Sequence, residues 1–131
     1  MIKLSEEFNH DFIVSEIIYN GFIEIFNDRN PIHTNPSFSR EFNFKDKVMH
    51  GNILNGFLSY FIGEILPVKN VVIISQTINF KNPVYLNDSL MFSAKVFETF
   101  QSVNIVSFKY SFVKDDKSIA ANGKIQIKIL S

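Results

Sequence analysis

A carboxylate and an imidazole lie five residues apart in the segment Asp28-Arg29-Asn30-Pro31-Ile32-His33. On a regular helix these two side chains would not share a face. Pro31 stops the preceding helix, and the turn around it lets Asp28 and His33 point into one cleft. Together they would hold a water molecule, remove its proton and later return a proton to carbon. The simpler alternative is that Asp28 caps a turn and that His33 is an ordinary surface or packed histidine.

A second feature, His50-Gly51, stands directly before the most apolar helix candidate. A glycine at a helix entrance lets another molecule approach the backbone closely. The free N–H groups and the positive dipole end of that helix suit an oxygen atom that gains negative charge. The alternative is that Gly51 serves only the turn. His50 is expected to shape the loop and not to exchange protons, because it precedes the helix start.

The first half of the chain supplies the helices that would position these residues. Apolar side chains recur on one helix face over residues 14–26, with Ser15 as the expected N-cap. Asn35-Pro36 predicts a short helix that runs toward residue 40. Residues 52–66 are apolar around more than one face, which is typical of a helix surrounded by other structure, and Pro67 follows as a stop.

From residue 71 onward the pattern predicts β-strands. Four runs rich in β-branched and aromatic residues cover 71–80, 89–100, 103–113 and 119–130. In the last run, isoleucines at 125, 127 and 129 alternate with polar residues, which gives one buried and one solvated face. Helices followed by an antiparallel meander predict an α+β fold with the apolar helix covered by the sheet. With no repeat or linker, residues 1–131 are expected to form a single domain.

Composition excludes several classes of function. The 131 residues are 46% hydrophobic and 20% charged, as in a globular protein with its own core. A formal net charge of +0 argues against a nucleic-acid binder. The absence of cysteine excludes disulfides and thiolate chemistry, and His33 and His50 have no partner at ligand spacing, so no metal site is expected. No segment resembles a secretory signal or a membrane span, and we expect a cytoplasmic protein with no membrane partner.

Three segments, in this order, resemble the MaoC-like enoyl-thioester hydratases. Residues 19–38, with Asn27-Asp28-Arg29-Asn30-Pro31-Ile32-His33-Thr34-Asn35-Pro36, look like the hydratase motif of that family. Val48-Met49-His50-Gly51 resembles the second family element, and Phe80-Lys81-Asn82-Pro83-Val84-Tyr85-Leu86-Asn87-Asp88 resembles the third. The three segments span most of the chain.

The resemblance implies a hot-dog fold, in which a long central helix, here residues 52–66, is wrapped by an antiparallel β-sheet. It also implies a homodimer with its sites near the subunit interface. The substrate would be an acyl thioester of coenzyme A or of acyl carrier protein, and no cofactor is expected.

The resemblance further assigns roles to individual residues. Asp28 and His33 would activate a water that adds to C3 of a trans-2-enoyl thioester, and the reverse reaction would dehydrate an (R)-3-hydroxyacyl thioester. The Gly51 N–H would stabilise the charge on the thioester carbonyl oxygen. Asn30 would brace the catalytic loop, and Ser59 would form a hydrogen bond near the dyad.

The chain departs from the family pattern at three asparagines. Asn27 and Asn87 stand where the family often has glycine, and asparagine tolerates the left-handed backbone that such turns require. Asn52 replaces a residue that is often apolar, and it would place an extra polar group near the substrate carbonyl. A non-standard substrate would then fit.

Two other functions remain open at this level. A hot-dog thioesterase would use a carboxylate to activate water at the thioester carbon, and it would release a free thiol. A non-catalytic acyl-thioester-binding protein of the same fold would bind the substrate and turn over nothing.

Overall fold

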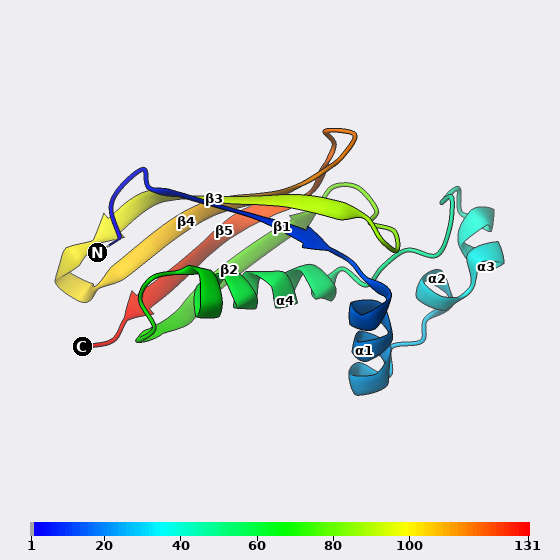
Figure 1. Ribbon diagram of the computed structural model, residues 1–131, viewed down its shortest axis with the longest axis horizontal. Helices are drawn as coiled ribbons and strands as arrows, with labels where there is room; N and C mark the ends of the chain where they lie inside the picture. The colour runs from blue at the N-terminus through cyan, green and yellow to red at the C-terminus, as the bar shows by residue number, and fades with distance from the viewer. Residues whose placement is uncertain (1) are drawn as a thin grey trace.

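A single curved antiparallel sheet forms the larger part of the computed structural model, which describes residues 2–131 (Figure 1). Its strands are β1 (Glu7–Ile13), β2 (Val71–Phe80), β3 (Ser89–Phe100), β4 (Ile105–Lys114) and β5 (Ile119–Ile129). They lie in the order β1-β3-β4-β5-β2, with every neighbouring pair antiparallel. Strands β1 and β2 are therefore the two edges of the sheet.

The apolar central helix lies along one face of this sheet (Figure 1). It comprises α4 (Asn52–Tyr60), continued by one π-helical turn, η1 (Phe61–Ile65), so the helix predicted for residues 52–66 is confirmed. Leu58 and Phe61 are fully buried against the sheet residues Phe92 and Phe108, which are fully buried as well. Burying several such side chains is the main source of stability for a domain of this size.

Three shorter helices project from one end of the sheet (Figure 1). They are α1 (Glu16–Phe26), α2 (Pro31–Thr34) and α3 (Pro36–Glu41). The predicted caps are confirmed, because Ser15 Oγ accepts a hydrogen bond from the Ile18 N–H and Asn35 Oδ1 accepts one from the Phe38 N–H. Asparagine also occupies the left-handed backbone at Asn27 and Asn87, with φ of 57° and 69°. The turns expected to need glycine are thus formed without it.

The structure corrects the sequence analysis at two places. Strand β1 occupies residues 7–13, within a region interpreted as the start of a helical half. Its apolar alternation is weak, because the polar residue His10 stands on the inner face and the apolar residue Ile13 on the exposed face. The strand expected over 103–113 begins two residues later, after a short 3₁₀ turn, η2 (Gln101–Val103). Within residues 2–131, no helix has both the length and the apolar character needed to cross a membrane.

Candidate active site

The loop that carries Asp28 is built by local hydrogen bonds between α1 and α2. The left-handed residue Asn27 ends α1 and donates its N–H to the Ile23 carbonyl over 2.8 Å. Asp28 Oδ1 then accepts from the Asn30 N–H at 3.3 Å, and Asn30 Oδ1 accepts from the Ile32 N–H at 3.0 Å. Asn30 is therefore the N-cap of α2. The Asn30 side chain thus caps α2 within the segment that joins Asp28 to His33.

The His33 ring is held in one orientation by the segment before α4. Its Nδ1 lies 2.7 Å from the Val48 carbonyl oxygen. A carbonyl oxygen only accepts hydrogen bonds, so the proton of the neutral ring resides on Nδ1 and the lone pair on Nε2. The Tyr19 hydroxyl also donates to the His33 carbonyl over 2.5 Å. Both the ring and the backbone of His33 are thus fixed from other elements.

Asp28 and His33 come together as the turn at Pro31 requires. His33 Nε2 lies 3.9 Å from Asp28 Oδ2, and the two side chains are 17% and 48% exposed. Both atoms accept hydrogen bonds when the histidine is neutral, so neither satisfies the other. A water molecule placed between them would donate one hydrogen to each. The pair is therefore arranged to bind and polarise water.

His50 contacts both members of this pair. Its Nε2 donates to the Asp28 carbonyl oxygen over 2.8 Å, and its ring stacks on the His33 ring with centroids 3.9 Å apart. The ring is buried, and its Nδ1 has no hydrogen-bond partner among the described residues. Burial, assisted by the neighbouring His33, lowers the pKa of His50 below its ordinary value. His50 therefore stays neutral and anchors the Asp28 backbone.

The expectation that His33 and His50 lack a partner at ligand spacing is wrong. One potential ligand atom each from Asp28, His33 and His50 lies within 4.8 Å of the others. Linear spacing missed this cluster, because the fold brings together residues up to 22 positions apart. His50 nevertheless presents no open lone pair, since Nε2 donates to Asp28 and Nδ1 is buried. Of this cluster, only Asp28 and His33 offer an accessible ligand atom, which is fewer than a typical protein zinc site provides.

Gly51 is a glycine because of its neighbour and not because of its backbone. Its φ and ψ of −58° and −35° are helical, which any residue adopts. A Cβ at this position would lie 2.8 Å from Phe80 Cε1 and 2.9 Å from Cζ. Gly51 is the N-cap of α4, and no partner for its N–H is found within residues 2–131. The aromatic ring therefore packs directly on a helix start with a free donor.

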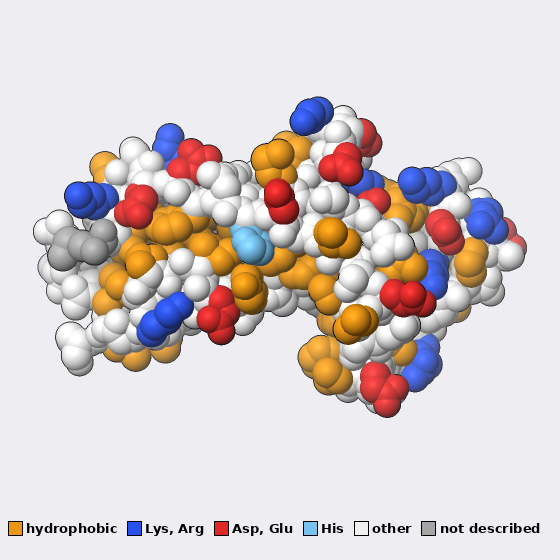
Figure 2. Space-filling model, in the orientation of Figure 1, with side chains coloured by type: hydrophobic (Ala, Val, Ile, Leu, Met, Phe, Trp, Pro, Cys, Tyr) orange, Lys and Arg blue, Asp and Glu red, His pale blue; other side chains and the backbone are white. Residues whose placement is uncertain are grey.

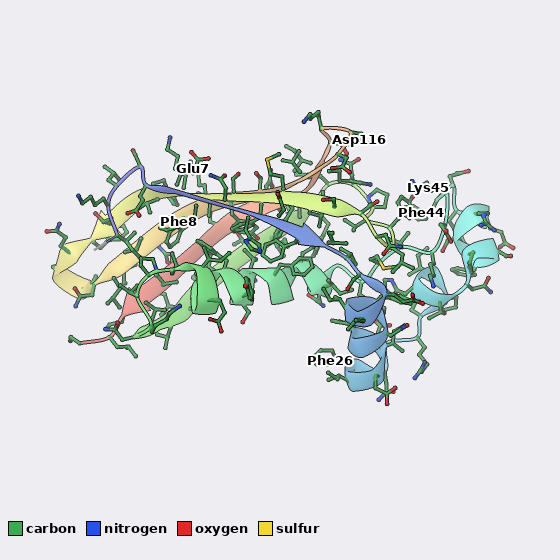
Figure 3. The ribbon with its side chains drawn as sticks, in the orientation of Figure 1. Glu7, Phe8, Phe26, Phe44, Lys45 and Asp116 are labelled. Atoms are coloured by element: carbon green, nitrogen blue, oxygen red, sulfur yellow. The ribbon has the colours of Figure 1, made fainter. Side chains whose placement is uncertain are left out.

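The residues described above line a cavity of about 450 Å³, here called the reaction cavity. Asp28, His33 and Gly51 all line it, together with Phe80 and with Phe44 from the segment after α3, which is labelled in Figure 3. Ser59 does not belong to this group. It is exposed on α4, outside the lining of the cavity, and forms no side-chain hydrogen bond within the described residues, so the structure does not support the role expected for it.

Three residues that shape the site have no assigned role in the sequence analysis: Tyr19, Val48 and Phe80. Val48 contributes its backbone carbonyl, and every residue has one, so its residue type could not indicate this role. Tyr19, Val48 and Phe80 are the first residues of the three segments that resemble the family, and that position was the available signal. Their contacts with His33 and Gly51 become visible only in three dimensions.

Comparison with known proteins identifies the family. The family model described as the MaoC like domain matches residues 5–118. The chain belongs to the MaoC-like family. A 3-hydroxybutyryl-CoA dehydratase of Methylorubrum extorquens is 35% identical over 97 residues, which are 74% of this chain and 60% of that protein. An (R)-specific enoyl-CoA hydratase of Aeromonas caviae is 25% identical over 109 residues, 83% of this chain and 81% of that protein.

Solved structures confirm the hot-dog fold of this MaoC-like chain. The (R)-hydratase from A. caviae involved in PHA biosynthesis superposes with a TM-score of 0.89 at 21% identity and covers 98% of each chain. The (R)-hydratase PhaJ1 from Pseudomonas aeruginosa gives a TM-score of 0.87 at 23% identity over 98% of this chain and 82% of that one. The α+β prediction of a central helix with an antiparallel sheet is therefore confirmed.

The lowered pKa of His50 predicts a pH dependence of stability. Below the ordinary histidine pKa of 6.5, the unfolded chain takes up a proton that the folded protein resists, so the free energy of unfolding falls as the pH drops. His50→Gln keeps an N–H for the Asp28 carbonyl but does not titrate. Urea denaturation at about pH 7.5 and about pH 5 should show a smaller decrease for this variant than for the wild type. Equal decreases in the two proteins would contradict the assignment.

The contact between Gly51 and Phe80 predicts non-additive stabilities. Gly51→Ala should lower the free energy of unfolding by about 1–3 kcal/mol, because the new methyl group overlaps the ring. In a Phe80→Ala background the same change should cost much less, because the overlapping atoms are gone. Chemical denaturation of the four proteins of this cycle measures the coupling. If the two changes add independently, Phe80 is not the reason for glycine at position 51.

Proposed function

We propose that this protein adds water to the double bond of a trans-2-enoyl thioester and, in reverse, dehydrates an (R)-3-hydroxyacyl thioester. The observation that carries the proposal is the pair of acceptors, Asp28 Oδ2 and His33 Nε2, 3.9 Å apart at the wall of a cavity that also holds the start of α4. Membership of the MaoC-like family and the named activities of its relatives support this reaction. The acyl group is carried by coenzyme A or by acyl carrier protein.

The proposed reaction needs only groups of this chain. The thioester carbonyl oxygen accepts the Gly51 N–H, and C3 lies beside the water held by Asp28 and His33. As the water oxygen bonds to C3, His33 Nε2 takes a water proton and the double-bond electrons move onto the carbonyl oxygen. The helix start stabilises that negative charge, and Asp28 stabilises the histidinium. His33 then returns the proton to C2, which restores the carbonyl and the neutral ring.

Removing either member of the dyad should abolish hydration. Asp28→Asn and His33→Ala should each lower kcat/KM for crotonyl-CoA by a factor of roughly 10² to 10⁴, the range that general acid–base groups contribute. The measurement is the loss of enoyl-thioester ultraviolet absorbance. Asp115→Asn, in the turn between β4 and β5, is the matched control and should retain wild-type activity.

Two results would argue against the proposal. Undiminished hydration by both dyad variants would show that water is activated elsewhere. Release of free thiol by the wild type, with no loss of the double bond, would indicate a thioesterase.

The assembly that we propose is a homodimer formed through β2. This strand is an edge of the sheet, and residues 72–77 are exposed on both of its faces, whereas β3, β4 and β5 bury one face. Val72, Ile73 and Ile74 are each more than 40% exposed. An apolar edge strand with unpaired backbone groups is a template for another strand. A second copy, paired along β2, would extend the sheet and cover these side chains.

Light scattering after size-exclusion chromatography should give about twice the 15.1 kDa mass of the chain. Val72→Lys should shift the protein toward the monomer, because it places a charge in the apolar contact. Met91→Lys, at an exposed apolar position on β3, is the control and should stay dimeric. A wild-type monomer at micromolar concentration would exclude this interface.

A further inference from the structure

A second cavity adjoins the reaction cavity and shares a wall with it. It has a volume of about 780 Å³ and is here called the side cavity. Phe22, Asp28, Asn52 and Ile53 line both cavities, whereas Gly51 and His33 line only the reaction cavity. Phe26 lines the side cavity from the lower end of α1 (Figure 3), where apolar side chains gather on the surface (Figure 2).

If the proposed function holds, the way these residues are divided between the two cavities determines the orientation of the substrate. The thioester carbonyl lies at Gly51 in the reaction cavity, and C3 lies at Asp28 in the shared wall. The acyl chain beyond C3 therefore continues into the side cavity, where Asp28 is found and Gly51 is not. Lys81 lines only the reaction cavity. Its positive charge is therefore available to the phosphate groups of the carrier, which lies at the other end of the substrate.

Apart from Asp28 in the shared wall, the polar side chains of the side cavity belong to one connected set of amides. Gln76 Nε2, on β2, donates to Asn55 Oδ1 over 2.5 Å, and Asn55 Nδ2 donates to Asn52 Oδ1 over 2.8 Å. Both asparagines line the side cavity. The Oδ1 atom of Asn52 is thereby occupied, and its Nδ2 group has no partner within residues 2–131. The chain of amides thus ends in two free N–H donors at the wall that the acyl group passes.

We propose that Asn52 selects an acyl group that carries a neutral oxygen, as an ether or a hydroxyl, beyond C3, where the chain passes the shared wall. An oxygen there accepts the Asn52 Nδ2 hydrogens, which a plain hydrocarbon chain leaves unpaired. A carboxylate is disfavoured, because Asp28 lines the same cavity and neither lysine nor arginine does. Asn55 and Gln76 are positioning residues, since they fix which end of the Asn52 amide faces the chain.

The test compares two thioesters that differ only by oxygen in place of one methylene. Wild-type protein should hydrate trans-4-methoxybut-2-enoyl-CoA with a kcat/KM roughly fivefold to tenfold above that for trans-hex-2-enoyl-CoA, the worth of a neutral hydrogen bond. Asn52→Leu should abolish or invert this ratio, and Gln76→Leu should reduce it. Asn20→Leu makes the same change on an exposed face of α1, outside both cavities, and should keep the wild-type ratio.

A binding measurement separates this inference from the hydratase proposal. Calorimetry with the saturated analogues 4-methoxybutanoyl-CoA and hexanoyl-CoA reports the same preference without turnover. Tighter binding of the methoxy compound by wild type, lost in Asn52→Leu, supports the inference even if crotonyl-CoA is not hydrated. Equal or weaker binding of the methoxy compound, or a preference that survives in Asn52→Leu, overturns it. Normal hydration of crotonyl-CoA in that case leaves the proposed reaction intact.

Discussion

The hydrogen bond from His33 Nδ1 to the Val48 carbonyl is the interaction on which the site depends. It joins α2 to the segment before α4, and it decides which ring nitrogen carries the proton. If the bond were absent, the ring would be free to rotate and Nε2 would lose its fixed place opposite Asp28. The Tyr19 hydroxyl donates to the His33 carbonyl, and His50 Nε2 donates to the Asp28 carbonyl. Helix α2 and the loop before it are therefore held at two further points. The geometry of the Asp28–His33 pair thus depends on the packing around it as much as on the two side chains.

The fold explains why this loop stays in place. The helix from Asn52 to Ile65 is buried along the sheet, so its first turn is a rigid point to which the loop is attached. The Met49 N–H donates to the Val84 carbonyl and the Val48 N–H to the Ile32 carbonyl. The segment before α4 is therefore hydrogen-bonded both to the segment before β3 and to α2. The free N–H at the helix start and the Asp28–His33 pair are thereby held at fixed positions relative to each other.

Local signals in the sequence predicted more than long-range ones did. The caps at Ser15 and Asn35, the central helix and the late strands follow from residues close together in the chain. The residue types and the turn at Pro31 predicted Asp28 and His33 as a pair before any distance was known, and the family resemblance assigned the pair its role. It did not reveal that His50 stacks on His33, that Ser59 faces solvent or that Gln76 reaches Asn55, because these contacts depend on how separate elements pack. Strand β1 was missed since an edge strand buries little and shows weak alternation.

The contact between Gly51 and the Phe80 ring also constrains the order in which the sequence can change over evolutionary time. A larger residue at position 51 fits without rearrangement once position 80 has become smaller, because the backbone itself would accept the change. In the reverse order, the half-exposed Phe80 ring must first move out of the way. The two positions, 29 residues apart, therefore form an epistatic pair, in which a glycine persists as long as an aromatic ring is retained opposite it.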